Sequence, residues 1–215
     1  MRLSIITIFI LIFFQACSLK TPKNQWEYNS SSAFSSYVNN FLTSEFDLAN
    51  DDLNKAVKYA KQSANLNQLG GIYLGSCALN ISVGIKDECK EYNQIKELLN
   101  SEELSAYYSM LQNKIDKKQI EFLPKQYQSF QLNKLSNIDN IFTSIKSIEE
   151  VSSQFIAASL VIEHLKKSEI KYLLDKASSY GYKSLVLFYL KNLYNIEEDI
   201  EQKQLILKKI KILQI

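Results

Sequence analysis

The 215-residue chain is poor in the residues that interrupt helices or assemble catalytic centres: it has two prolines, five glycines, three cysteines and one histidine. So few prolines and glycines disfavour a turn-rich sheet fold and favour helices joined by short polar turns. A single histidine excludes metal sites built from several histidines. Charge of one sign is also missing, because 25 Lys and Arg against 23 Asp and Glu leave a net charge of +2. No global field attracts nucleic acid, so we expect no nucleic-acid partner.

Motifs for cofactors and catalysis are missing as well. The sequence has no glycine-rich phosphate loop and no dinucleotide fingerprint, which predicts no cofactor and no small-molecule substrate. His164, the only histidine, has no nucleophile tied to it by spacing and is interpreted as a partly exposed structural residue. The acidic runs Glu149-Glu150 and Glu197-Glu198-Asp199 lie near expected helix starts, where carboxylates stabilise the helix dipole. The chain is therefore not expected to be an enzyme.

Apolar residues recur every three or four positions along most of the chain, which is the period of a buried helix face. One such stripe precedes Gly181, which suits the left-handed conformation at a helix end, and a second follows a predicted Ser147–Glu150 capping box. The two stripes are Ile170, Leu173, Leu174 and Ala177, and Val151, Phe155, Ala158, Ile162 and Leu165. No stretch alternates with period two. The predicted class is all-α, with roughly ten helices of average length.

The first residues indicate export. Arg2 precedes an apolar run from Leu3 to Phe14, which is shorter than the roughly 20 apolar residues that span a membrane. The junction Phe14-Gln15-Ala16-Cys17 resembles the lipobox of bacterial lipoproteins, in which the cysteine is acylated and begins the mature chain. That resemblance implies lipidation of Cys17, and Ser18 in place of Asp favours the outer membrane over the inner one. The alternative is an ordinary secreted protein in which Cys17 is incidental.

Composition divides the chain into three parts. Residues 1–16 are interpreted as the lipoprotein signal peptide. Residues 17–32 are polar and rich in Ser and Asn, which is typical of a flexible tether, here lipid-anchored. Residues 33–215 are predicted to form one helical domain, long enough to bury its own core.

Two patches resemble helical repeats. The segment LNKAVKYAKQSANLNQ, with Ala56 and Ala60 at small packing positions, and the following GIYLGSCALNISVG, with Cys77-Ala78, resemble a tetratricopeptide repeat. The segment KASSYGYKSLVLFYLKNLY resembles the related Sel1-like repeat through Lys176, Ala177, Gly181, Leu190 and Tyr194. The resemblance implies antiparallel hairpins stacked as a short α-solenoid. The alternative is an irregular helical bundle.

Cys77 and Cys89 flank a turn marked by Gly84 and Lys86-Asp87. Export would place them in an oxidising compartment, and facing positions of a helical hairpin would allow a structural disulfide. The alternative is two unpaired small core residues. No C-x-x-C motif indicates redox activity, and two cysteines alone cannot complete a zinc site.

These features favour a lipoprotein anchored in the outer membrane, facing the periplasm, that acts as an adaptor or scaffold for an envelope assembly by binding another envelope protein. The alternative is a cell-wall glycan-binding or glycan-cleaving envelope protein, since unpaired Glu or Asp residues could line a cleft. A purely structural surface lipoprotein is a third reading. The basic end KKIKILQI, with Lys208, Lys209 and Lys211, suits either a membrane-facing helix or the polar outer face of a terminal helix.

Overall fold

The computed structural model describes residues 23–136 and 140–214, and every regular element in these ranges is helical. Eleven α-helices and three short 3-10 helices occur there, so the all-α prediction is confirmed. The α-helices are α2 (Gln25–Thr43), α3 (Phe46–Ala60), α4 (Asn67–Ser82), α5 (Lys90–Ile95), α6 (Glu102–Leu111), α7 (Lys125–Ser136), α8 (Ile141–Lys146), α9 (Val151–Ser159), α10 (Lys167–Ser179), α11 (Lys183–Ile196) and α12 (Ile200–Leu213). The 3-10 helices are η1 (Lys96–Leu98), η2 (Lys117–Phe122) and η4 (Ile162–His164).

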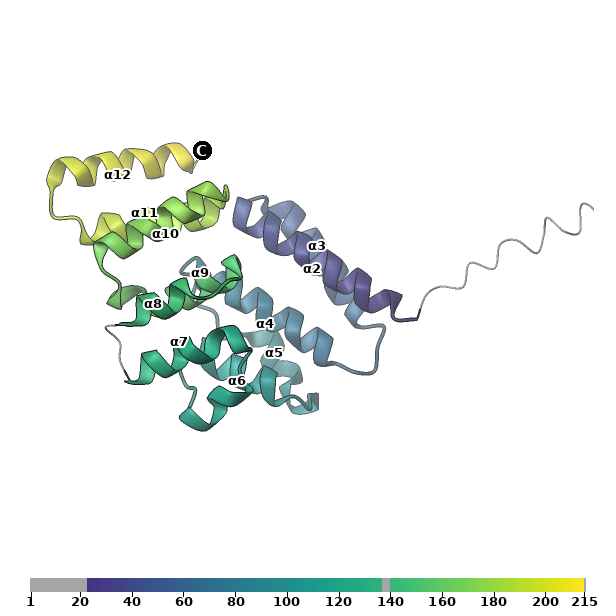
Figure 1. Ribbon diagram of the computed structural model, residues 1–215. Helices are drawn as coiled ribbons and strands as arrows, with labels where there is room; N and C mark the ends of the chain where they lie inside the picture. The colour runs from purple at the N-terminus through teal and green to yellow at the C-terminus, as the bar shows by residue number, and fades with distance from the viewer. Residues whose placement is uncertain (1–22, 137–139, 215) are drawn as a thin grey trace, which may run out of the picture.

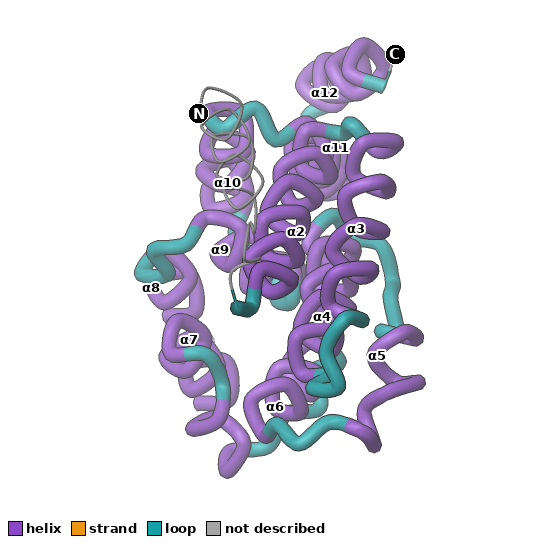
Figure 2. Tube along the Cα trace, turned by 90° about the vertical axis from the view of Figure 1, so that its right-hand side faces the viewer, coloured by secondary structure: helices purple, strands orange, loops and turns teal. Residues whose placement is uncertain are grey.

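The helices fall into three groups along the chain (Figure 1). Helices α2 and α3 pack along each other as a hairpin, and α10, α11 and α12 form a second group at the other end of the sequence. Helices α4 to α9 lie between them in the sequence and below both groups in the view of Figure 1. Helix α4 is the centre of the molecule, because it contacts α2 and α3 on one side and α6 and α9 on the other (Figure 2).

Contacts also join helices that are distant in the sequence. Helix α2 packs against α11, and α4 packs against α9. In an α-solenoid each repeat contacts only its neighbours along the chain, whereas here the first hairpin touches the last helical group. The helical class is confirmed, and the finer prediction of a stacked solenoid is not.

Helix α2 corrects the predicted boundary between tether and domain. It begins at Gln25, inside the segment 17–32 that composition assigned to a flexible tether. The Ser30 side chain is fully buried, and its Oγ donates a hydrogen bond of 2.9 Å to the carbonyl oxygen of Ala56 in α3. Ala33 packs beside it against the α3–α4 cluster. Because its hydroxyl is hydrogen-bonded, Ser30 can take a core position that hydropathy does not reveal.

Glycine and proline shape three positions of the fold. At Gly75 an added Cβ would lie 2.4 Å from Phe34 Cζ, so glycine lets α2 approach α4 closely. Pro124 separates η2 from α7, at a position where proline suits the start of a helix. Gly181 adopts φ +70° just after α10, and Ile170, Leu173 and Ala177 are the buried face of that helix, as predicted.

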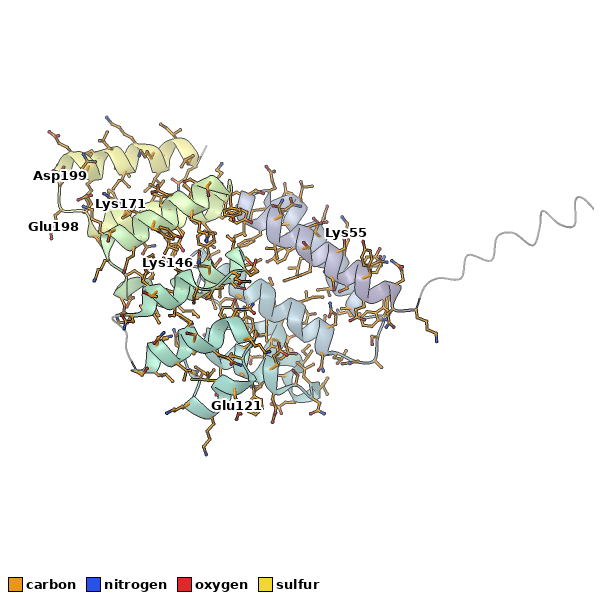
Figure 3. All side chains as sticks on the ribbon, in the orientation of Figure 1. Lys55, Glu121, Lys146, Lys171, Glu198 and Asp199 are labelled. Carbon is orange, nitrogen blue, oxygen red and sulfur yellow. A yellow bond between two sulfur atoms is a disulfide. The ribbon has the colours of Figure 1, made fainter. Side chains whose placement is uncertain are left out.

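Charged side chains lie mainly on the outer faces of the helices. Lys55, Glu121 and Lys171 are examples, and all three are exposed (Figure 3). Helix α12 is the least embedded α-helix of its group, because Ile210 is its one buried residue whereas Ile200, Leu205 and Ile212 are exposed. The polar outer face predicted for the last helix therefore carries exposed aliphatic residues among its lysines.

Candidate functional site

The lipidation site predicted at Cys17 lies outside the described residues, so it stays a prediction. Within residues 23–136 and 140–214, no helix combines the length and the apolar character that crossing a bilayer requires.

Cys77 and Cys89 form a disulfide, as the sequence predicted. Their Cα atoms are 5.2 Å apart, and both residues are buried, with 2% and 1% exposure. The supporting geometry differs from the expectation of two facing helices. Cys77 lies in α4, but Cys89 precedes α5 at the end of the loop 83–89, with a left-handed φ of +52°. The chain returns to α4 by folding the loop back rather than by a helix crossing.

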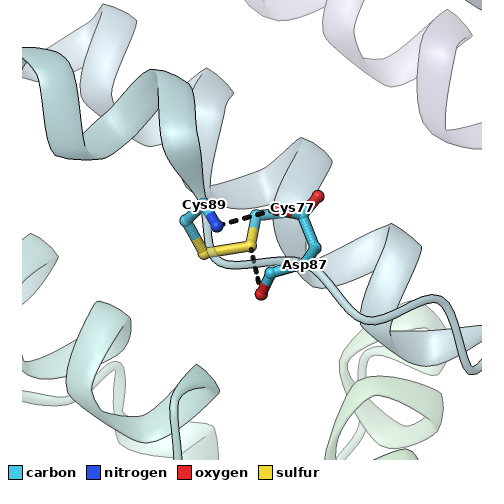
Figure 4. Close-up of side chains that lie close together, drawn as sticks. All are labelled: Cys77, Asp87 and Cys89. Atoms are coloured by element: carbon cyan, nitrogen blue, oxygen red, sulfur yellow. Dashed lines mark hydrogen bonds between the residues drawn. A yellow bond between two sulfur atoms is a disulfide. The ribbon is translucent and has the colours of Figure 1, made fainter.

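Asp87 fixes the loop beside the disulfide (Figure 4). Its Oδ2 accepts a hydrogen bond from Asn80 Nδ2 at 2.7 Å, and its Oδ1 accepts one from the backbone N–H of Cys89 at 2.7 Å. Its carbonyl oxygen accepts from Gln112 Nε2 in the turn after α6, at 3.1 Å. An aspartate that accepts from the backbone two residues ahead is a common turn-forming device. Asp87 thereby ties the loop to α4 and to the end of α6.

Sequence reasoning missed this bracing. The Asp87–Cys89 spacing was an available signal for the local turn, because aspartate favours such turns. The partners Asn80 and Gln112 had no sequence signal, since they come from separate elements. The donor atoms of Cys77, Asp87 and Cys89 lie within 4.8 Å of one another. Metals bind thiolates, however, and sulfurs joined in a disulfide are not thiolates.

A groove of about 730 Å³ opens on one side of the loop 83–89, and we call it the disulfide groove. Its walls are α3, α4 and the segment that leads into α5. Its lining residues are Leu53, Asn54, Val57, Tyr73, Ser76, Cys77, Asn80, Lys86, Asp87, Glu88, Lys90 and Glu91. Lysines and carboxylates both line the wall formed by residues 86–91, while α3 and α4 contribute two amides, a phenol, a hydroxyl, the Cys77 sulfur and two aliphatic residues.

The floor of the disulfide groove is held by a tyrosine beneath it. The hydroxyl of Tyr37 in α2 lies 2.9 Å from Ser76 Oγ. Burial raises the pKa of Tyr37, with a hydrogen bond from Ser76 opposing the shift and Asp87 adding to it, so the phenol is neutral near pH 7. A neutral hydroxyl pair at the floor and the side-chain amides of Asn54 and Asn80 on the walls are groups that can form hydrogen bonds with a polypeptide backbone.

A second cavity, of about 510 Å³, is lined by residues of the same loop, and we call it the His164 cavity. It shares Lys86, Asp87 and Glu88 with the disulfide groove. His164 lies at its edge in η4 and is exposed. The histidine predicted to be partly exposed therefore lies at the surface, where it lines this cavity together with Glu163.

The acidic runs stabilise helix starts, as predicted. Asp199 caps α12 by accepting from the Gln202 N–H at 2.8 Å. Glu150 caps α9 by accepting from the N–H groups of Ser152 and Ser153. Burial raises the pKa of Glu150, but the hydrogen bonds from Ser153 and Ser152 outweigh it and leave this pKa lowered. The predicted box, with Ser147 as the cap, is wrong by three positions because Glu150 is itself the capping residue.

Glu197 is the one buried carboxylate among the described residues. It accepts a hydrogen bond of 2.6 Å from Lys167 Nζ at the start of α10, which forms a salt bridge. The Lys167 hydrogen bond lowers the pKa of Glu197, against the effect of desolvation, and the N–H groups of Asp199 and Glu198 lower it further. Its position joins α10 to the loop between α11 and α12, so its role is structural.

Neither a family model, nor a curated protein, nor a solved structure matches this chain. The lipobox and helical-repeat resemblances therefore rest on the sequence motifs alone.

Proposed function

We propose that the protein is a lipoprotein, anchored in the outer membrane through Cys17 and facing the periplasm, that acts as an adaptor or scaffold by binding another envelope protein. The observation that carries the proposal is the disulfide groove, a hollow of about 730 Å³ with Tyr73, Asn54 and Asn80 on its walls. Tyrosines and amides form adaptable hydrogen bonds with protein partners, and a pre-organised wall lowers the entropy lost on binding.

The bracing of the groove supports binding rather than catalysis. The Asp87 carboxylate accepts hydrogen bonds at both oxygens, from Asn80 and from Cys89. A carboxylate that holds a loop in this way is occupied, whereas a general acid or base must exchange a proton with the substrate. The groove thus offers a fixed, mixed-charge surface.

The decisive experiment is site-specific photo-crosslinking in intact cells. A photoreactive amino acid at Asn54, which is exposed on the groove wall, should yield one reproducible envelope-protein adduct by mass spectrometry. The matched control places the same group at Lys118, which is exposed in η2 away from the groove. Recovery of only uncrosslinked protein and lipid adducts from Asn54 would contradict the adaptor proposal.

The anchor is tested separately. Replacing Cys17 by Ala should move the protein from the membrane fraction to the soluble fraction, because acyl chains on this cysteine would supply the membrane affinity. A Cys17→Ala protein that still sediments with membranes contradicts the anchor and leaves the groove experiment unaffected.

Glycan binding is the second candidate, since Glu88 and Glu91 also line the disulfide groove. Purified peptidoglycan sacculi should then retain the protein in a sedimentation assay, and Glu88→Gln with Glu91→Gln should abolish retention. An adaptor that binds only protein gives no retention for either form.

A further inference from the structure

A third hollow lies where the two ends of the domain meet. We call it the Phe188 cleft. Its volume is about 340 Å³, and its walls come from the α2–α3 junction, the end of α4 with the loop that follows, α11, and the end of α12. Segments far apart in the sequence build it, in the region where α2 packs against α11. Ligand sites commonly occur at such junctions between structural units.

Most of the residues that line the Phe188 cleft are apolar. Phe188 packs over Gly84, where an added Cβ would lie 2.7 Å from Phe188 Cε2. Leu187 and Leu213 also line the cleft. Two further lining residues are large, apolar and exposed to solvent: Phe46 is 56% exposed and Ile85 is 52% exposed. Exposed apolar residues gathered around one hollow are a feature that interaction sites share.

Among residues 23–136 and 140–214, the charged side chains that line the Phe188 cleft have one sign. They are Lys183 and Lys191, and no carboxylate side chain of these ranges lines it. The salt bridges among the described residues are Lys55–Asp52 and Lys167–Glu197, so both cleft lysines lack an ionic partner there. Glu45 and Asp47 flank Phe46 in the sequence but do not line the cleft.

The spacing of the two lysines defines the shape of a complementary ligand. They are eight residues apart on α11, which corresponds to about 12 Å along a helix axis. Leu187 and Phe188 lie between them on the same helix. An anion with a single head group would meet one lysine, whereas a peptide with carboxylates on both sides of an apolar cluster meets both.

We propose that the Phe188 cleft binds an acidic amphipathic segment of a protein partner, with apolar side chains inserted over Phe188 and carboxylates paired with Lys183 and Lys191. This inference rests on the proposed adaptor function and names the chemistry of the bound segment. Insertion of apolar anchors into a groove with charges at its edge is a recurrent mode of peptide recognition. Binding here also bridges the α2–α3 hairpin and α11, so it stabilises the contact between the two ends of the domain.

The test uses the full chain in nanodiscs of zwitterionic phospholipid, with empty nanodiscs as blank. The probe is a fluorescent synthetic helical peptide with leucines on one face and glutamates beside them. Its counterpart carries lysine in place of every glutamate. Fluorescence anisotropy should show saturable binding of the glutamate peptide only. Lys183→Glu with Lys191→Glu should weaken that binding about tenfold or more and create binding of the lysine peptide, because complementary charge sets specificity.

The matched control replaces Lys117 and Lys118, exposed in η2, by Glu, which changes the net charge equally. It should bind both peptides as the parent does. Thermal unfolding of the Lys183/Lys191 variant should match the parent, since neither lysine forms a salt bridge in the described structure.

Three results would overturn the inference: no saturable binding of the glutamate peptide, equal binding of both peptides, or the same peptide affinity in the parent and in the Lys183/Lys191 variant. Saturable binding of decanoate that is lost in the Lys183/Lys191 variant, without peptide binding, would replace the peptide with a fatty acid. None of these results affects a crosslink from Asn54 in the disulfide groove, so failure of the cleft and failure of the adaptor function are distinguishable.

Discussion

Ser184 Oγ in the first turn of α11 donates a hydrogen bond of 2.8 Å to the carbonyl oxygen of Phe41 in α2, across 143 positions of sequence. Its single hydroxyl proton is used in that bond. The 2.8 Å contact with Ser44 Oγ must therefore be donated by Ser44. The chain of two hydroxyls and one carbonyl ties the first hairpin to the last helical group, next to the Phe188 cleft.

Ser184→Ala should lower the free energy of unfolding by about 1 kcal/mol. The loss is moderate because the Phe41 carbonyl also accepts from the Ser44 N–H at 3.2 Å and keeps that partner. Urea denaturation measures it. Ser178→Ala is the control, because Ser178 is exposed and its hydroxyl bonds only within α10. Equal midpoints for both variants would show that the tie contributes nothing.

Two glycines with similar positive φ values differ in the space around them, so they can be compared directly. Gly84 has φ +81° and Gly181 has φ +70°, so alanine is strained at both. At Gly181 an added Cβ meets nothing within 4 Å, whereas at Gly84 it would lie 2.7 Å from Phe188 Cε2. Gly181→Ala should cost about 1 kcal/mol, and Gly84→Ala should cost about 1–3 kcal/mol more because Phe188 must shift. Thermal or urea unfolding of both variants measures the difference, and equal losses would show that Phe188 adapts freely.

Periodicity predicted the helices but not how they meet. The stripe of Ile170, Leu173 and Ala177 is the buried face of α10, because a helix of average amphipathicity must bury one side. The start of α2 at Gln25 was missed because Ser30 occupies a core position through a hydrogen bond rather than through hydrophobicity.

The contacts around the candidate sites depend on tertiary neighbours. Ser184 meets Phe41, and Gln112 meets the Asp87 carbonyl, only after distant segments pack. The spacing of residues in the sequence does not predict such long-range pairs. The disulfide was predictable because the chain has only three cysteines, and two of them lie close together on either side of a turn. The groove beside it also depends on α3, which lies outside that turn.

Removing the disulfide should destabilise the domain. The double substitution Cys77→Ala and Cys89→Ala removes a crosslink between residues 12 positions apart. The unfolded chain then gains conformational entropy, which should lower the free energy of unfolding by about 3 kcal/mol. Urea denaturation of the variant measures the loss, and the parent denatured with and without a reductant supplies the control. Non-reducing peptide mapping should find the two cysteines joined. Free thiols at both in exported protein would remove this support of the groove.

Glu197 should make stability depend on pH in acid. Its folded pKa is lowered by the Lys167 hydrogen bond, so its carboxylate is favoured in the folded state relative to the unfolded value of about 4.3. The contribution is fully present above the unfolded pKa and is lost as the pH falls through the lower, folded pKa. Urea midpoints from pH 7 to pH 3 should show Glu197→Gln less stable than the parent at pH 7, with the gap closing towards pH 3.

The neighbouring exchange Glu198→Gln is the matched control, because Glu198 is exposed and its variant should follow the parent at every pH. The lowered pKa of Glu150 acts in the same direction, but it is common to the parent and both variants and cancels in the comparison. A gap between Glu197→Gln and the parent that stays constant from pH 7 to pH 3 would mean that shape rather than charge at position 197 holds α10 to the loop before α12.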